Sequence, residues 1–225
     1  MVKKLISEET EWSRVAEELK AEKIKLAFYD NTVISLLGNV KNRKILDYGG
    51  GPGVLAITLK KLGADIKEYD ISEDMRKKAS EKIGEENIYH NVGEIPKNKF
   101  DLIICNLVLC IVSEDEVKRI VKNIKNALNK KGFAFIGFCN PKLLDVQETN
   151  LDLRPKPSHK YEENHSYMKT KKEGGYQIIE NHRPIEWYER VYEELGLKLV
   201  GVFFTPEYKL KGKNIKDFII FKLRK

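Results

Sequence analysis

The sequence predicts an α/β fold in which helices cover both faces of a largely parallel sheet. Three observations predict it. Over residues 44–139, strand-like apolar runs alternate with stretches of helical periodicity. A glycine-rich turn joins the first of these strands to the helix behind it. The run at residues 100–109 is apolar almost throughout, which is typical of a strand buried on both faces of a parallel sheet. The chain has 225 residues, and we expect residues 1–225 to form one domain.

The glycine-rich turn carries the clearest functional signal. Asp47, Gly49, Gly51 and Gly53 follow the pattern D-x-G-x-G-x-G directly after a short apolar strand. Glycine tolerates positive φ, and its missing Cβ lets the backbone lie against a ligand. The unpaired N–H groups of the next helix's first turn also point toward that ligand. The apolar stripe of this helix consists of Val54, Leu55, Leu59 and Leu62.

A carboxylate follows at the end of the next predicted strand, residues 64–70. Asp70 lies twenty-three residues after Asp47. Its side chain can accept both hydrogen bonds of a ribose diol. Together with the glycine turn, this acid predicts a nucleoside-containing ligand.

These motifs resemble those of the class I S-adenosylmethionine-dependent methyltransferases. The resemblance implies a Rossmann-like, seven-stranded mixed sheet with its last strand antiparallel. It also implies S-adenosylmethionine as cofactor, S-adenosylhomocysteine as product, and methyl transfer by in-line displacement. The cofactor-binding residues that it implies are Tyr29, Asp47, Gly49, Gly50, Gly51, Asp70, Ile71, Glu94, Asn106 and Leu107.

Several of these assignments rest on position relative to the predicted strands. Tyr29 resembles a tyrosine near the methionine end of the cofactor, and Glu94 resembles an acid that binds the adenine amino group. Asn106 and Leu107 end the strand at 100–109, where such sheets bind ligands. The Asn/Asp-Pro-Pro-aromatic motif of base N-methyltransferases is missing there. Asn106 and Asn140, which follow this strand and the next, are neutral amides rather than acidic metal ligands, so we expect no metal.

A dinucleotide-binding enzyme is the main alternative for the glycine turn. The residues from Gly51 to Ala56 also fit G-x-G-x-x-G/A, and Asp70 would suit a dinucleotide ribose. However, that pattern does not need Asp47 before the glycines. About forty residues of helix-like sequence also precede the first strand, whereas a dinucleotide fold usually starts with that strand. The resemblance implies that residues 1–40 form a helical cap over the cofactor. An oxidoreductase is therefore the less favoured reading.

Residues 140–183 interrupt the alternation of strands and helices, with a proline-rich tract and a predicted hairpin near residues 166–179. Long connections with many ring side chains usually serve a function, and the resemblance to small-molecule methyltransferases implies that this insertion after the fifth strand forms a substrate lid. Its histidines are candidates for a general base that would activate a hydroxyl acceptor. These candidates are His159, His165 and His182, and the candidate substrate-binding residues are Tyr161, Tyr167 and Tyr176.

The remaining elements agree with this fold. Ser72 and Ser113 are predicted N-caps, the second within a capping box. A helix should start near Pro184. Strands are expected at 197–204 and 217–223, and a short basic loop between them leaves no room for a helix, so they should pair antiparallel.

Composition narrows the function classes. The net charge is +7, yet acids and bases are interspersed, so a nucleic-acid partner is permitted but not favoured. The longest apolar run, residues 102–112, is too short to span a membrane, and the first residues lack the apolar core of a signal peptide. The three cysteines form no C-x-x-C pair, and we expect a cytoplasmic protein with reduced thiols.

The favoured function is methyl transfer to an N or O atom of a small molecule. An RNA or peptide methyltransferase is the alternative, and the sequence defines no oligomeric state.

Overall fold

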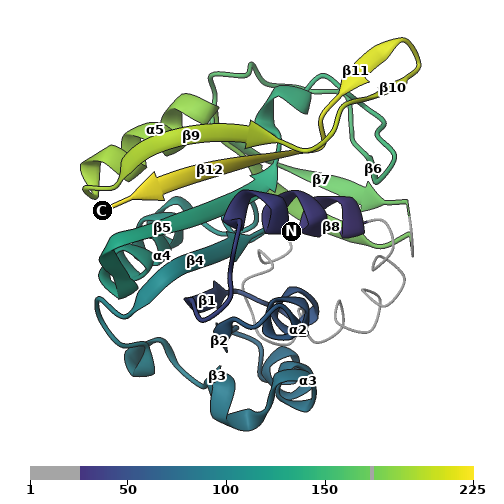
Figure 1. The fold of residues 1–225 in the computed structure, drawn as a ribbon. Helices are drawn as coiled ribbons and strands as arrows, with labels where there is room; N and C mark the ends of the chain where they lie inside the picture. Colours follow the sequence, from purple (N-terminus) through teal and green to yellow (C-terminus); the bar gives the residue numbers. More distant parts are fainter. Residues whose placement is uncertain (1–25, 173–174) are drawn as a thin grey trace.

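A computed structural model describes residues 26–172 and 175–225 (Figure 1). Its main element is a seven-stranded sheet with the order β3-β2-β1-β4-β5-β12-β9. The strands β1 to β5 pair in parallel, whereas β12 lies antiparallel between β5 and β9. This confirms the predicted α/β class and the antiparallel last strand. The strands are β1 (Lys44–Tyr48), β2 (Asp65–Tyr69), β3 (Ile88–Tyr89), β4 (Phe100–Asn106), β5 (Leu128–Cys139), β9 (Lys198–Phe204) and β12 (Phe218–Arg224).

The helices form where capping residues and apolar stripes predicted them. Ser72 Oγ accepts a hydrogen bond from the Met75 N–H at the start of α3, and Ser113 Oγ accepts one from the Glu116 N–H at the start of α4. The helices are the segment 26–37, α2 (Val54–Lys61), α3 (Glu73–Ile83), α4 (Glu114–Ala127) and α5 (Ile185–Glu194).

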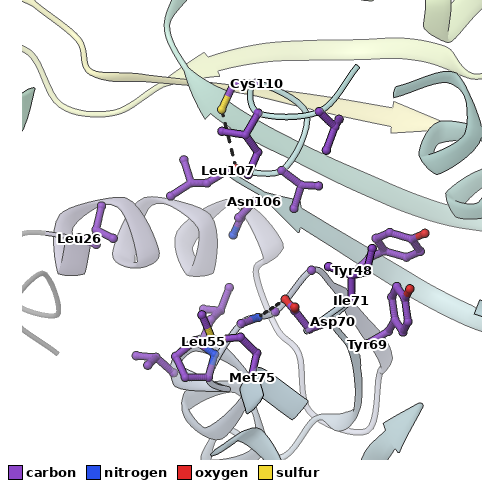
Figure 2. A pocket seen from close by; sticks show the side chains of 18 of the residues that line it. Leu26, Tyr48, Leu55, Tyr69, Asp70, Ile71, Met75, Asn106, Leu107 and Cys110 are labelled. Atoms are coloured by element: carbon purple, nitrogen blue, oxygen red, sulfur yellow. Dashed lines mark hydrogen bonds between the residues drawn. The ribbon is translucent and has the colours of Figure 1, made fainter. Parts of the chain in front are cut away.

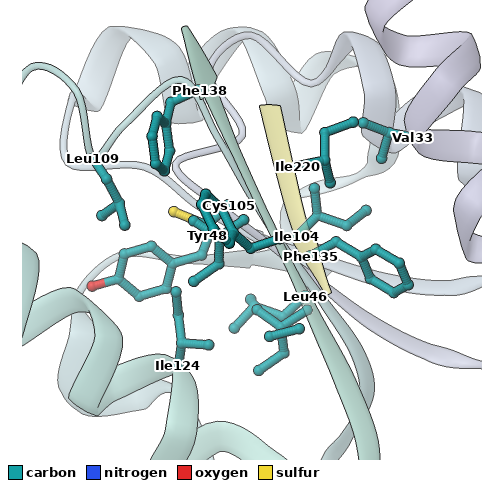
Figure 3. Packing of buried hydrophobic residues seen from close by; sticks show 14 of the residues in the cluster. Val33, Leu46, Tyr48, Ile104, Cys105, Leu109, Ile124, Phe135, Phe138 and Ile220 are labelled. Carbon is teal, nitrogen blue, oxygen red and sulfur yellow. The ribbon is translucent and has the colours of Figure 1, made fainter. Parts of the chain in front are cut away.

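The core lies along both faces of the central strands. Figure 3 shows Leu46, Ile104 and Phe135 on neighbouring strands, with Val33 of the helix 26–37 on one side and Ile124 of α4 on the other. All five side chains are buried. Covered on both faces, the sheet holds the carboxyl ends of its parallel strands rigidly in one place.

The insertion after β5 forms a separate three-stranded antiparallel sheet. The predicted hairpin is present as β7 (His165–Lys171) and β8 (Gln177–His182), and β6 (Asp152–Leu153) pairs with β7. A one-turn helix, η3 (Pro141–Leu143), joins β5 to this sheet. The chain then returns to the main sheet through α5 (Figure 1).

The third strand contains only Ile88–Tyr89, because the one-turn helices η1 (Glu85–Asn87) and η2 (Val92–Glu94) take up the residues on either side. The structure differs from the sequence prediction in one connection. The link from β9 to β12 is a hairpin rather than a plain loop, with strands β10 (Tyr208–Leu210) and β11 (Lys213–Ile215).

The predicted helical cap at 1–40 lies largely outside the described residues, which begin at residue 26. Within the described ranges, the model contains no helix with the length and apolarity needed to cross a membrane.

Candidate active site

A pocket of about 530 Å³ opens at the carboxyl ends of β1, β2 and β4 (Figure 2). It has two ends, which come from different parts of the chain. The glycine-loop end is formed by Gly49, Gly50, Gly51, Asp70 and Ile71. The inserted-sheet end is formed by Cys110, Cys139, Lys169, Lys171, Tyr176 and Glu180. The pocket thus joins the predicted cofactor site to the predicted lid.

The glycine turn has the backbone geometry that its sequence predicted. Gly49, Gly51 and Gly53 have φ values of 76°, 61° and 72°. The Gly49 N–H donates to Tyr69 O at 2.6 Å and so fixes the turn to the end of β2. A Cβ on Gly51 would have no heavy atom within 4 Å, whereas one on Gly50 would strike the side chain of Glu68. Gly51 therefore presents bare backbone to the pocket.

Asp70 lies beside this turn and organises it. Its Oδ2 accepts a hydrogen bond from the Gly51 N–H at 2.9 Å, and its Oδ1 accepts one from the Ser72 N–H at 2.9 Å. Burial raises the pKa of Asp70, and these hydrogen bonds oppose the increase. Each carboxylate oxygen has two lone pairs, so both can still accept a ligand hydroxyl. The side chain thus fits the predicted ribose diol.

Two further acids lie behind the glycine turn. Asp47 is 2% exposed, and burial with the nearby Asp30 and Asp70 raises its pKa to about 7. Glu68, its register partner on β2, is 0% exposed, and its carboxyl oxygens have no hydrogen-bond partner. Burial, with Asp47 and Asp70, raises the pKa of Glu68 to about 10. Neither acid lines the pocket, so the predicted contact between Asp47 and the cofactor stays a prediction.

At the end of β4, the backbone bends sharply into the pocket. Leu107 has a φ of 61°, which is unusual for a residue with a Cβ, and its N–H donates to Gly137 O at 2.7 Å. Asn106 and Leu107 both line the pocket, as expected. Tyr29 does not line it. Its ring is buried, and its hydroxyl donates to Asn106 Oδ1 at 2.8 Å. The structure thus gives Tyr29 a contact with Asn106 rather than with the pocket.

Ile71 and Glu94 were both predicted to contact the cofactor. Ile71 lines the pocket and is 46% exposed, which suits an apolar side chain that a ligand would cover. Glu94 is exposed and lies outside the pocket lining, because it accepts hydrogen bonds from the His90 N–H and the Asn91 side chain. Val92, two residues earlier, lines the pocket instead. The adenine contact of Glu94 stays a prediction.

The three candidate histidines lie together but outside the pocket lining. Ring centroids are 4.5 Å apart for His159 and His165, and 4.9 Å apart for His165 and His182. His182 Nε2 lies 2.8 Å from the Tyr161 carbonyl oxygen, and burial lowers the pKa of His182. The geometry gives no support to a general base among them.

Of the three candidate tyrosines, Tyr176 lines the pocket. The Tyr167 hydroxyl donates to Glu180 Oε1 at 2.6 Å, and the Tyr161 hydroxyl accepts from the Ile185 N–H at 2.9 Å. Tyr161 and Tyr167 therefore support the insertion rather than face the pocket.

The sequence analysis missed Asp30, which lines the pocket next to Tyr29 in the chain. Burial raises the pKa of Asp30 to about 6. Its signal in the sequence, an acid one residue from a predicted site tyrosine, was too weak to use.

A network of buried charges supports the inserted-sheet end. Lys169, 1% exposed, lies 3.0 Å from Asp152 Oδ2 and also pairs with Glu180. Asp152 pairs further with Arg154 at 3.1 Å and Lys171 at 3.0 Å. Burial alone would raise the pKa of Asp152, but the three cations hold it well below its ordinary value. No motif in the sequence indicated these pairs, because their members come from three strands.

Within the described ranges, one group of potential metal-ligand atoms converges. The sulfur and oxygen atoms of Cys110, Cys139 and Glu180 lie within 4.8 Å of one another. Lys169 already places a positive charge against Cys139 and Glu180. We therefore assign no metal to this group.

Comparisons with known proteins agree with the fold. Residues 46–136 match a family described as a methyltransferase domain. A solved S-adenosylmethionine-dependent methyltransferase from Mesorhizobium loti superimposes with a TM-score of 0.67 at 19% identity, covering 88% of this chain and 98% of that one. A DhpI complex with S-adenosylmethionine superimposes with a TM-score of 0.62 at 15% identity, covering 96% of this chain and 95% of that one.

Curated relatives match over a shorter stretch. The ribosomal protein L11 methyltransferase of Lactobacillus johnsonii is 33% identical over 122 residues, which is 49% of this chain and 37% of that protein. The corresponding protein of Caldicellulosiruptor saccharolyticus is 32% identical over 109 residues, or 45% of this chain and 34% of that protein. The chain thus spans about a third of the length of these relatives.

The sheet order and the antiparallel β12 give this chain the fold of the solved S-adenosylmethionine-dependent methyltransferases, and residues 46–136 are similar to a methyltransferase domain. These findings agree with the predicted class I S-adenosylmethionine-dependent methyltransferase fold. The dinucleotide alternative is not supported.

Proposed function

We propose that this protein transfers a methyl group from S-adenosylmethionine to a small molecule. One observation carries this proposal: the glycine-loop end and the inserted-sheet end share one pocket of about 530 Å³. Sites for small ligands and cofactors typically measure about 300–1,000 Å³. The inserted sheet closes the acceptor side with side chains such as Lys169, Tyr176 and Glu180. Such a wall favours a small acceptor over a folded protein or an RNA helix.

The residues at the glycine-loop end would hold the cofactor. Gly51 would allow the cofactor to approach the backbone, and Asp70 would accept hydrogen bonds from its ribose. Bound S-adenosylmethionine supplies an electrophilic methyl group. Leu107 and Asn106 then lie where the cofactor and the acceptor meet, and the inserted sheet keeps water out of that space.

A hydroxyl acceptor also needs a group that takes its proton. We assign this role to Asp30, because it lines the pocket and its pKa of about 6 leaves most of it ionised at neutral pH. Asp30→Asn should lower turnover of such an acceptor about a hundredfold and leave the affinity for S-adenosylhomocysteine unchanged. Equal turnover by wild type and variant would remove Asp30 from this role.

The first experiment is a calorimetric titration with S-adenosylhomocysteine, with NAD as the control ligand. Micromolar binding of the first and none of the second is expected. Methyl transfer from radiolabelled S-adenosylmethionine is then compared between a library of small amines, alcohols and thiols and two macromolecules, ribosomal protein L11 and total RNA. Label in the small-molecule fraction supports the proposal.

Protein methylation is the second candidate, because the curated relatives named above are ribosomal protein L11 methyltransferases. Label found only in L11 would overturn the small-molecule proposal and favour this candidate. Label found only in RNA would overturn both. Binding of NAD alone would show that the cofactor itself had been misassigned.

A further inference from the structure

Cys139 stands out among the polar groups of the pocket. It ends β5 at the inserted-sheet end, is 7% exposed and lines the pocket. The Lys169 ammonium donates a hydrogen bond to its sulfur at 3.1 Å. The sulfur of Cys110 lies within 4.8 Å of it. A thiol that lies against both a buried ammonium and a second thiol is not simply an apolar core residue.

Charged and titratable groups face Cys139 from every side. Cys110 comes from the loop after β4, Lys169 from β7, and Glu180 from β8. The other facing groups are Asp152 of β6, Arg154 just after it, and Tyr29 of the helix 26–37. The neighbouring Cys110 thiol and the charge of Lys169 together hold the pKa of the Cys139 thiol below its ordinary value, although burial and the two carboxylates oppose them.

The other two cysteines show what this environment changes. Cys105, also on a central strand, is fully buried and does not line the pocket, and burial raises the pKa of its thiol. Cys110 lines the pocket and its thiol donates to the Leu107 carbonyl oxygen at 3.7 Å, and the nearby Cys139 together with burial raises its pKa as well. Lys169 donates a hydrogen bond only to Cys139 among these described thiols.

We propose that Cys139 is a thiolate and the site at which soft carbon electrophiles modify this protein. The sulfur donates an electron pair to the electrophilic carbon and forms an S–C bond, while the leaving group departs with its bonding electrons. Lys169 keeps the sulfur ionised before the reaction. Its ion pairs with Asp152 and Glu180 are already present and remain after it. The adduct occupies the inserted-sheet end and blocks the acceptor, whichever acceptor this is.

The test is alkylation of the native protein by iodoacetamide from pH 5.5 to 9.5, with peptide mass spectrometry to follow each cysteine. Iodide is the leaving group, so no other reactant is needed. Cys139 should react fastest, and its rate should level off below the value of about 8.5 for a free cysteine. Cys105 should stay unmodified and serves as the internal control.

Variants then test the role of Lys169. Lys169→Gln should lower the rate at Cys139 about tenfold or more at pH 7, whereas Lys169→Arg should keep most of it. Circular dichroism checks that each variant is folded. If Lys169→Gln does not fold, Cys110→Ala replaces it. Because Cys110→Ala removes the thiol beside Cys139, it should slow the reaction severalfold at pH 7.

Two outcomes would overturn the proposal. One is a Cys139 rate that rises tenfold per pH unit up to pH 8.5, as for an ordinary thiol. The other is a Cys139 that stays unmodified at all pH values while the protein remains folded. Alkylated protein should also bind S-adenosylhomocysteine with nearly unchanged affinity, because the adduct lies away from the glycine-loop end. These readouts need no methyl transfer, so they stand apart from the proposed function.

Discussion

The two ends of the pocket are built from different chemical groups. The glycine-loop end relies on backbone: three glycines at positive φ, and an aspartate, Asp70, whose two oxygens already hold backbone N–H groups. The inserted-sheet end relies on side chains, with Asp152 alone pairing with three cations. The first design suits a ligand that never changes, and the second can be altered residue by residue. In the proposed function, the first end would hold the cofactor and the second would hold the acceptor.

The largest expected effect tests whether the charge network holds the inserted-sheet end together. Asp152→Asn leaves three buried cations without their shared partner, and should lower the free energy of unfolding by about 3–5 kcal/mol. The pKa of Asp152 is lower in the folded than in the unfolded protein. Its contribution is therefore full above the unfolded pKa and is lost as pH falls through the folded one. Urea unfolding at pH 7 and near pH 2 measures both.

The matched control is Glu148→Gln, which removes an acid from a surface network with Lys172 and Lys211. It should leave stability unchanged. Equal losses for the two variants would show that burial of the network has no special weight.

At the glycine-loop end, Gly51→Ala should weaken S-adenosylhomocysteine binding about a hundredfold, because the new Cβ enters the space against the cofactor. Gly212→Ala is the control. Gly212 also has positive φ and open space around a Cβ, but it lies in the β10–β11 hairpin outside the pocket lining. Both variants carry similar backbone strain, so only loss of binding confined to Gly51→Ala supports the close approach.

The third effect concerns Glu68, one of the two buried acids behind the glycine turn. Glu68→Gln should raise the free energy of unfolding by about 2 kcal/mol at pH 8. The pKa of Glu68 is raised to about 10 in the folded protein, so its carboxyl group stabilises the fold most below its unfolded pKa and progressively less as pH rises toward 10. The advantage of the glutamine should thus shrink toward pH 5. An advantage that stays constant from pH 5 to pH 9 would contradict the raised pKa.

The smallest of the four effects is on the ribose contact. Asp70→Ala should weaken S-adenosylhomocysteine binding at least tenfold, because a buried diol loses its acceptor and the Gly51 N–H loses its partner. Asp70→Asn keeps one acceptor oxygen and should fall between wild type and alanine. Calorimetry that finds the three proteins equal would remove Asp70 from the cofactor site.

The sequence predicted the first end far better than the second, for a physical reason. A positive φ needs glycine, and a ribose diol needs an acid at a strand end, so Gly51 and Asp70 are recognisable by type and spacing. Lys169, Glu180 and Asp152 lie on different strands of the inserted sheet, and only their pairing in space makes them informative. Cys139 likewise appeared to be an ordinary core thiol, because the lysine that changes its chemistry is thirty residues away.

The placement of β12 has a consequence for how the pocket forms. This strand lies between β5 and β9, with Phe218 opposite Cys139, although β5 comes much earlier in the chain. Strand β12 can therefore pair only after the intervening chain has folded or moved out of its way. That chain forms the inserted sheet, α5, β9 and the β10–β11 hairpin. Such distant pairing is slow, because a long loop must close before its contacts stabilise it. The glycine-loop end can thus form early in folding, whereas the inserted-sheet end beside Cys139 is completed among the last steps.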